Sequence, residues 1–297
     1  MSQSAPRSIE HYLRDLRAEL QGADPALIQD ALYDAEEYLR AEVASHPDKT
    51  EADVLELISS TYGAPAEVAA AYRSTEATVA AALATPRRAP APSALGRFFG
   101  IYADSRAWTS LFYALLALPV GIFYFTVAVT GLSMSAGFAV LVIGIPFFLL
   151  FIGFTRILAL AEGRIVEGLL GVRMPRRPRS PPSEATLFGR IKAMLSDPRT
   201  WTTLLYMLVM LPLGICYFTG TVVLTALACA FILAPVALLA GFPVMVFDGT
   251  YNLSWLGSTV LTIVGILLLT LFLHLIRAIG AFHGQIAKRL LVSRESE

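Results

Sequence analysis

Apolar residues dominate three long stretches in the last two thirds of the chain. No Asp, Glu, Lys or Arg occurs in residues 107–155, 200–247 or 249–276. A bilayer-spanning helix needs only about 20 predominantly apolar residues, and a soluble fold of 297 residues has no core large enough to bury this much uncharged sequence. We therefore expect a polytopic membrane protein. Its four expected spans cover about 108–132, 136–158, 202–225 and 256–279.

The first 85 residues have a different pattern, in which apolar and polar positions alternate with the period of a helix. Asp24-Pro25 suits a helix N-cap followed by proline at the first helical position. Thr50 and Asp53 have the spacing of a capping box, and Gly63 suits a left-handed helix end. These signals predict a soluble unit of four helices.

Charge separates the same two parts, although the net charge of the whole chain is zero. Residues 1–95 hold 8 Lys and Arg against 15 Asp and Glu, a balance of −7, and residues 96–297 hold 15 against 8, a balance of +7. An acidic surface repels nucleic acid and favours a basic protein partner, so we expect no direct nucleic-acid binding. The alternative is a merely solvated surface. The candidate partner face on the second expected helix comprises Asp30, Asp34, Glu36, Glu37 and Glu42.

Two short motifs in the soluble unit carry a family resemblance. The stretches Tyr33–Tyr38 (YDAEEY) and Tyr62–Ala69 (YGAPAEVA) lie in a helix, acidic helix, short helix, helix order. Residues 9–73 thereby resemble the HAAS type of bacterial helical signalling domain, although the family's usual Leu-Gly is Tyr62-Gly63 here. The resemblance implies signalling through contact with a protein partner, such as a transcriptional regulator, and no catalysis.

The apolar part contains an internal repeat. In a first block, residues reappear 93 positions later: Asp104, Arg106, Trp108, Tyr113, Leu118, Pro119, Gly121, Tyr124, Phe125 and Thr126 match Asp197, Arg199, Trp201, Tyr206, Leu211, Pro212, Gly214, Tyr217, Phe218 and Thr219. In a second block the spacing is 121: Gly144, Ile145, Arg156, Gly163, Ile165, Leu169, Leu170 and Arg173 match Gly265, Ile266, Arg277, Gly284, Ile286, Leu290, Leu291 and Arg294. The difference places an insertion of 28 residues in the second copy, at about 224–252. The repeat predicts two helical hairpins of the same polarity.

Basic residues set the expected orientation of these hairpins. Arg and Lys flank the expected spans on one side only, which the positive-inside rule makes cytoplasmic, together with both chain termini. Trp108 and Trp201 are the expected anchors at the membrane interface. We expect the insertion to be a re-entrant or interfacial element on the outer face. A fifth span is the alternative, but it would put Lys288 and Arg289 outside the cell.

A second resemblance covers residues 97–294. The motif Leu118-Pro119-Val120-Gly121-Ile122-Phe123-Tyr124-Phe125, with its second copy, resembles the sensor domain that precedes kinases in some bacterial signalling proteins. No kinase transmitter follows in the sequence, so we expect no phosphorylation by this chain. The expected domains are an acidic unit at 1–85, a linker at 86–96, repeat 1 at 97–174, a basic Pro-rich loop at 175–189 and repeat 2 at 190–297.

The spans offer few groups for chemistry. Neither a metal-ligand spacing of Cys and His nor a nucleotide-binding motif occurs, so we expect no cofactor and no metal. Proline inside a span frees a backbone carbonyl that needs another partner. The candidate kink cavity comprises Pro119, Gly121, Tyr124, Thr126, Pro212, Gly214, Tyr217 and Thr219, with a packing kink as the alternative. The candidate contacts to anionic lipid, or alternatively to the acidic unit, are Arg173, Arg176, Arg177 and Arg179.

The sequence thus predicts an all-α protein of the bacterial cytoplasmic membrane, with a small soluble helical domain and a membrane domain built from two parallel repeats. We expect a non-enzymatic signalling protein that senses a membrane state or apolar ligand and contacts a cytoplasmic partner. The alternative is an accessory subunit of a transport or lipid-handling complex. A membrane enzyme is the third hypothesis, and Asp248 is the residue whose mutation would test it. The sequence leaves open whether the chain forms a homo-oligomer.

Overall fold

The computed structural model describes residues 6–83, 93–138, 144–177, 194–241, 244–246, 249–251 and 254–292. Helices make up most of these residues, which confirms the all-α class. One short antiparallel pair departs from it, β1 (Val244–Val246) with β2 (Gly249–Tyr251), in the segment where the sequence predicts an insertion. Before it lies α10 (Ala234–Leu239), whose six residues are too few to cross a bilayer.

The N-terminal unit contains α1 (Ile9–Glu19), α2 (Pro25–Ser45), α3 (Glu51–Ser59) and α4 (Pro65–Leu83). The expected caps are present. The Asp24 carboxylate accepts a hydrogen bond from the backbone amide of Ala26, and Thr50 and Asp53 form a complete capping box. Gly63 has a φ of 101°, the left-handed conformation that glycine adopts most easily. Leu16, Leu20, Leu39 and Val54 are fully buried between these helices and form the centre of their core.

The membrane module begins with α5 (Ala94–Phe99) and a short 3₁₀ helix (Gly100–Ala103). Its long helices are α6 (Ser105–Phe138), α7 (Gly144–Leu170), α9 (Pro198–Ile232) and α11 (Trp255–Leu291). In the described part of the chain, α6, α9 and α11 are each long and apolar enough to cross a membrane. α6 continues to Phe138, past its expected end at 132 and into the other expected span, 136–158. The rest of that span lies on residues 139–143, outside the described ranges, and on α7, and it stays a prediction.

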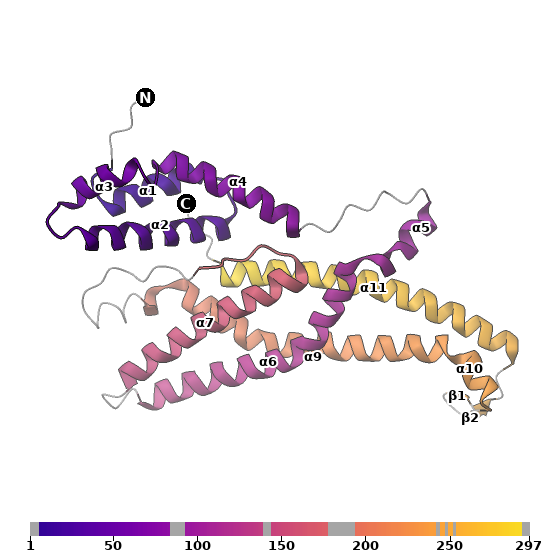
Figure 1. The fold of residues 1–297 in the computed structure, drawn as a ribbon. Coiled ribbons are helices and arrows are strands. Elements are labelled where there is room, and N and C mark those ends of the chain that lie inside the picture. The colour runs from indigo at the N-terminus through magenta and orange to yellow at the C-terminus, as the bar shows by residue number, and fades with distance from the viewer. Residues whose placement is uncertain are drawn as a thin grey trace.

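The long helices form two pairs that cross at α6 and α9 (Figure 1). From the crossing, α6 and α7 run to one side, and α9 and α11 run to the other. The N-terminal unit lies over the end of the module where α6 and α9 begin and α7 and α11 finish (Figure 1). The first helix of each pair therefore begins at the end of the module that carries the N-terminal unit.

Two glycines allow α6 and α9 to approach closely. A Cβ atom added at Gly121 of α6 would lie 2.6 Å from the Met210 carbonyl oxygen of α9. A Cβ at Gly214 of α9 would collide in the same way with the Ala117 carbonyl oxygen of α6. Small residues at helix crossings are the usual way for membrane helices to bring their backbones together. The crossing thus has no space for a larger residue at either position.

We expect Gly214→Ala to destabilise the module by about 1–3 kcal/mol, because its methyl group would meet backbone, which cannot move aside as a side chain can. Gly220→Ala is the matched control on the same helix, since a Cβ there meets no atom within 4 Å. Thermal unfolding in detergent, followed by tryptophan fluorescence, compares the two variants. Equal melting temperatures for both would contradict the close crossing.

The outer surface of the module is strongly apolar. Large side chains such as Leu150, Ile157 and Leu271 are more than half exposed. Soluble proteins rarely expose apolar surface on this scale, so the surface fits contact with lipid. Trp108 and Trp201 are also exposed, and each indole N–H donates to the backbone carbonyl six residues earlier, at 2.9 Å. Their role as anchors at the membrane interface stays a prediction.

Candidate functional site

A buried carboxylate lies at the centre of the module. Glu162 of α7 is 1% exposed, and three phenols surround it. The hydroxyls of Tyr113 and Tyr206 donate to its Oε1 at 2.8 and 2.7 Å. The hydroxyl of Tyr124 donates to Oε2 at 3.0 Å. Burying a charged group is costly unless it is hydrogen-bonded, and these donors supply that compensation.

His283 of α11 completes this buried cluster. Its imidazole is fully buried, with Nε2 2.6 Å from the Tyr113 hydroxyl and 3.1 Å from the Tyr206 hydroxyl. Each phenol has one proton, and both protons are donated to Glu162. The hydrogen-bond count therefore assigns the proton on Nε2 of His283, which donates to the phenol oxygens. Nδ1 of His283 is buried without a hydrogen-bond partner among the described residues.

The cluster joins the four long helices. α6 supplies Tyr113 and Tyr124, α7 supplies Glu162, α9 supplies Tyr206 and α11 supplies His283. A polar network buried this deeply favours the one arrangement of the helices that satisfies all of its members, because a partly satisfied network costs more than an apolar core. A substitution of any member would therefore disturb the packing of all four long helices.

A second polar centre connects α7 to the N-terminal unit. Arg173, three residues beyond the end of α7, has a side chain that is 10% exposed. Its guanidinium lies 3.0 Å from Asp30 of α2, 3.2 Å from Glu76 of α4 and 3.7 Å from Glu167 of α7. Burial acts to lower the pKa of Arg173, but these carboxylates together raise it above the ordinary value. One arginine thus binds both the N-terminal unit and the module.

Asp30 is the main acceptor on the other side of this contact. Besides Arg173, its Oδ1 accepts from the backbone amides of Arg176 and Arg177, at 2.6 and 2.7 Å. Burial raises the pKa of Asp30, while these amides and the charge of Arg173 act in the opposite direction. Burial outweighs them, so the pKa of Asp30 stays above its ordinary value, and the segment after α7 offsets only part of the cost of burying the carboxylate.

Further contacts extend the docking surface between the two parts, which we define as the contacts of α2 and α4 with the segment after α7 and with the adjoining ends of α9 and α11. Arg177 pairs with Asp34 at 2.7 Å. Gln29 accepts from Arg199, at the start of α9, at 2.9 Å. At the end of α11, Lys288 pairs with Asp24. Three separate parts of the module thus bind the N-terminal unit.

A comparison with known protein families covers most of this module. Residues 113–291 match the family described as "Putative sensor". This match extends over more than half of the chain. The chain belongs to this family. The matched range includes the whole buried cluster, from Tyr113 to His283, and it agrees with the resemblance seen in the sequence. No curated protein and no solved structure gave a match.

The family match begins at residue 113, so the whole N-terminal unit lies outside it. The candidate partner face on that unit is divided. Asp30 and Asp34 contact the segment after α7, whereas Glu36 pairs with Arg40 of α2 and Glu42 lies near His46. Glu37 is exposed. The module therefore covers only part of the predicted face.

The predicted kink-cavity residues do not gather at one place. Gly121 and Gly214 are buried at the crossing of α6 and α9. Tyr124 binds Glu162, and the ring of Tyr217 packs edge-on against His283 at 5.5 Å. The remaining four residues are exposed: Pro119, Thr126, Pro212 and Thr219. The crossing and the tyrosines therefore lie inside the module, and the prolines face outward.

The basic loop is only partly described. Arg173, Arg176 and Arg177 all contact the N-terminal unit, as the sequence analysis allowed beside anionic lipid. Arg179 lies outside the described residues. Among the described residues, no group of His, Cys, Asp and Glu could hold a metal ion.

Sequence reasoning missed Glu162 and His283. Both lie beyond the uncharged runs, in segments that resemble solvated helix ends, and it assigned neither a role. One signal was available. The spacing of 121 that relates the second repeat block also relates Glu162 to His283, and the spacing of 93 relates Tyr113 to Tyr206 and Tyr124 to Tyr217. The buried cluster consists of residues that these spacings connect.

Proposed function

We propose that this protein is a non-enzymatic sensor of the bacterial cytoplasmic membrane. In this proposal the module detects a condition of the membrane, and the acidic N-terminal unit passes that state to a cytoplasmic protein. One observation carries the proposal. The helix that holds Glu162 in the buried cluster continues to Leu170 and delivers Arg173 to Asp30 and Glu76 of the N-terminal unit.

Helix α7 can link the buried cluster mechanically to the docking surface, because the two lie close together along it. Glu162 and Glu167 lie five residues apart on one helix, and Glu167 binds Arg176 at 3.0 Å and Arg173 at 3.7 Å. A rotation or tilt of α7 that rearranges the buried cluster also moves the partners of these arginines. Helix shifts of this kind are a common way for proteins to transmit a change of state. The docked and released forms of the N-terminal unit would be the two output states.

The partner would compete for a surface that is occupied in the docked form. Asp30 and Asp34 bind Arg173 and Arg177 there, so a partner with a basic surface gains access to these carboxylates only after release. The acidic charge of the unit favours such a partner over nucleic acid. The resemblance of residues 9–73 to HAAS signalling domains points the same way.

We also propose that the module is an internal duplication with both termini in the cytoplasm. Paired contacts support this. Asp197 binds Arg156 at 3.5 Å, and the residues related to them by the spacings, Asp104 and Arg277, bind at 3.0 Å. Arginines and lysines gather where the N-terminal unit docks, and the positive-inside rule places such an end in the cytoplasm.

Crosslinking and affinity purification from native membranes test the proposed function. The intact protein, a version lacking residues 1–85 and an Arg173→Ala variant are compared. We expect a cytoplasmic protein that is absent with the deletion and enriched with Arg173→Ala, because release exposes Asp30 and Asp34. A membrane complex retained by all three would contradict the proposal and favour an accessory subunit of a transport or lipid-handling complex.

A further inference from the structure

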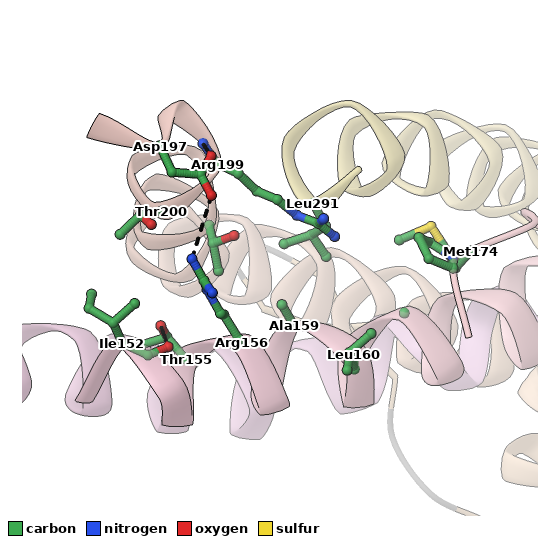
Figure 2. A pocket seen from close by; sticks show the side chains of 13 residues that line it. Ile152, Thr155, Arg156, Ala159, Leu160, Met174, Asp197, Arg199, Thr200 and Leu291 are labelled. Atoms are coloured by element: carbon green, nitrogen blue, oxygen red, sulfur yellow. Dashed lines mark hydrogen bonds and ion pairs between the residues drawn. The ribbon is translucent and has the colours of Figure 1, made fainter. Parts of the chain in front are cut away.

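A small cavity lies between α7 and α9, close to the docking surface but separate from the buried cluster. Its volume is about 50 Å³. A water molecule needs roughly 10–15 Å³ on this measure, so the cavity has room for a few waters or one small ionic group. Figure 2 shows that residues of α7 form one wall, residues of the start of α9 form another, and Leu291 and Met174 close the side.

The cavity has an apolar floor and a charged rim. Ile152, Met174 and Leu291 are buried along it. At the rim, Arg156 and Asp197 face each other, as the dashed line in Figure 2 marks, at 3.5 Å. Arg199 extends from α9 toward Leu291 (Figure 2). Among the described residues, two guanidinium groups and one carboxylate lie at this rim.

Threonines add to the polar wall. Thr155, Thr200 and Thr203 line the cavity, and each is at most 6% exposed. The Thr155 and Thr200 hydroxyls donate to the backbone carbonyls of Ile152 and Met194, both at 2.9 Å, so each can offer a ligand only its oxygen as an acceptor. The hydrogen-bond donors for an oxygen-rich group that enters the cavity are therefore chiefly the arginines at its rim.

The corresponding place in the other half of the module is closed. The spacings relate Ala159 of the cavity to Gly280 of α11, where an added Cβ would lie only 2.8 Å from Ser110 Cβ of α6. Helix α11 therefore packs directly on α6, whereas the methyl group of Ala159 stands between α7 and α9. Two of the cavity's threonines are also replaced there. Thr155 corresponds to Ile276 and Thr200 to Ala107, both buried.

The two halves thus share the arginines and the aspartate, but one half has an open, hydroxyl-lined cavity. We propose that this cavity binds the phosphate of an anionic membrane lipid. Arginine guanidinium groups, of which two lie at the rim, are the side chains that best match the oxygens of a phosphodiester.

The position of the cavity suits a lipid. Trp201, an exposed residue of the kind that favours the membrane interface, lies one residue beyond Thr200. Phe154 and Ile157, which flank Thr155 and Arg156 on α7, are 43% and 63% exposed. A lipid whose phosphate enters the cavity could lay its acyl chains against this apolar surface.

The cavity also connects to the docking surface, and this part of the inference rests on the proposed function. Arg199 lines the cavity and donates to Gln29 of α2 at 2.9 Å. A phosphate that binds Arg199 would compete with Gln29 for this guanidinium. Lipid binding would then weaken docking, so the sensed condition would be the anionic lipid content of the membrane.

Native mass spectrometry of the full-length protein in detergent tests the binding. Phosphatidylglycerol and phosphatidylcholine with identical acyl chains are added in turn. We expect bound phosphatidylglycerol at a higher occupancy than phosphatidylcholine. Arg156→Ala should weaken phosphatidylglycerol binding about tenfold, because a charge-assisted hydrogen bond is lost. Arg156→Gln, which keeps most of the side-chain length, should give the same loss.

Arg277→Ala is the matched control, because Arg277 pairs with the corresponding Asp104 in the closed half. It should change binding less than about twofold. Equal losses for both arginines, or unchanged binding in Arg156→Ala, would overturn the proposed site. Inorganic phosphate is the second arm. If it binds as tightly as the lipid and displaces it, the ligand is a soluble anion and the lipid assignment is wrong.

Different results would contradict the lipid site and the proposed function. Loss of phosphatidylglycerol binding in Arg156→Ala supports the site regardless of any partner. If phosphatidylglycerol binds but the fraction of docked N-terminal unit does not fall, the site stands and its proposed connection to docking through Arg199 and Gln29 is wrong.

Discussion

Replacing Arg173 with alanine should release the N-terminal unit from the sensor module. The change removes the charge that pairs with Asp30 and Glu76, and the Asp30 side chain is only 8% exposed. Removing one partner of a buried ion pair costs about 3–5 kcal/mol because the other charge is left uncompensated. Asp30 and Glu76 avoid this cost if α2 and α4 leave the module, because water then hydrates the two carboxylates. The docked population should therefore fall by about a hundredfold or more relative to the released one.

Distance measurements between spin labels can follow this release. Glu37→Cys on α2 and Gln285→Cys on α11 place labels at exposed positions, after the exposed Cys216 and Cys229 are replaced by alanine. We expect a narrow distance distribution in the parent protein and a long, broad one with Arg173→Ala. Arg289→Ala is the control, because Arg289 is exposed near the end of α11. An unchanged distribution with Arg173→Ala would show that other contacts hold the unit.

Replacing Glu162 with leucine should have the largest effect on the stability of the module. Leucine has a similar size but accepts no hydrogen bond, so the hydroxyls of Tyr113, Tyr124 and Tyr206 lose their acceptor. We expect a loss of about 3–5 kcal/mol, because buried donors left without an acceptor cost about 1–3 kcal/mol each. The melting temperature in detergent, followed by tryptophan fluorescence, measures this loss. A melting temperature equal to that of the parent would mean that the cluster does not stabilise the fold.

Two tyrosines, one in the buried cluster and one packed against it, provide a matched comparison. Tyr124→Phe removes one donor to Glu162 and should cost about 1.5–3 kcal/mol, the usual range for a hydrogen bond to a charged group. Tyr217 is related to Tyr124 by the spacing of 93 but contacts His283 through its ring. Tyr217→Phe keeps that ring and should leave the melting temperature nearly unchanged. Equal effects would indicate that burial of the rings matters more than their hydroxyls.

The sequence predicted the parts of the fold that depend on local rules. Such features could be recognised without knowing the fold. They are the helix caps at Asp24 and Thr50, the left-handed glycine Gly63 and the long apolar runs. The extent of α9 was less well predicted. It continues to Ile232, past the expected end at 225, because no polar or proline residue interrupts the helix there.

The candidate site depends on residues that meet only in three dimensions. Glu162 lies among Arg164 and Glu167 in sequence, a pattern typical of a solvated helix end, yet α7 buries it against tyrosines 38 to 49 residues away. Glu167, five residues later on α7, also lies among arginines in sequence, but it binds Arg176 beside the docking surface. Hydropathy alone could not distinguish these two roles, because it describes a segment and not its neighbours.

The paired positions of Glu162 and His283 have a consequence for assembly of the two hairpins. Two first hairpins placed together would bring two carboxylates to the centre, and two second hairpins would bring two imidazoles. Only a first and a second hairpin supply one acceptor and one donor to the shared phenols of Tyr113 and Tyr206. The hairpins are thus complementary and not interchangeable. If the two hairpins were made as separate chains, each should bind the other in preference to a copy of itself.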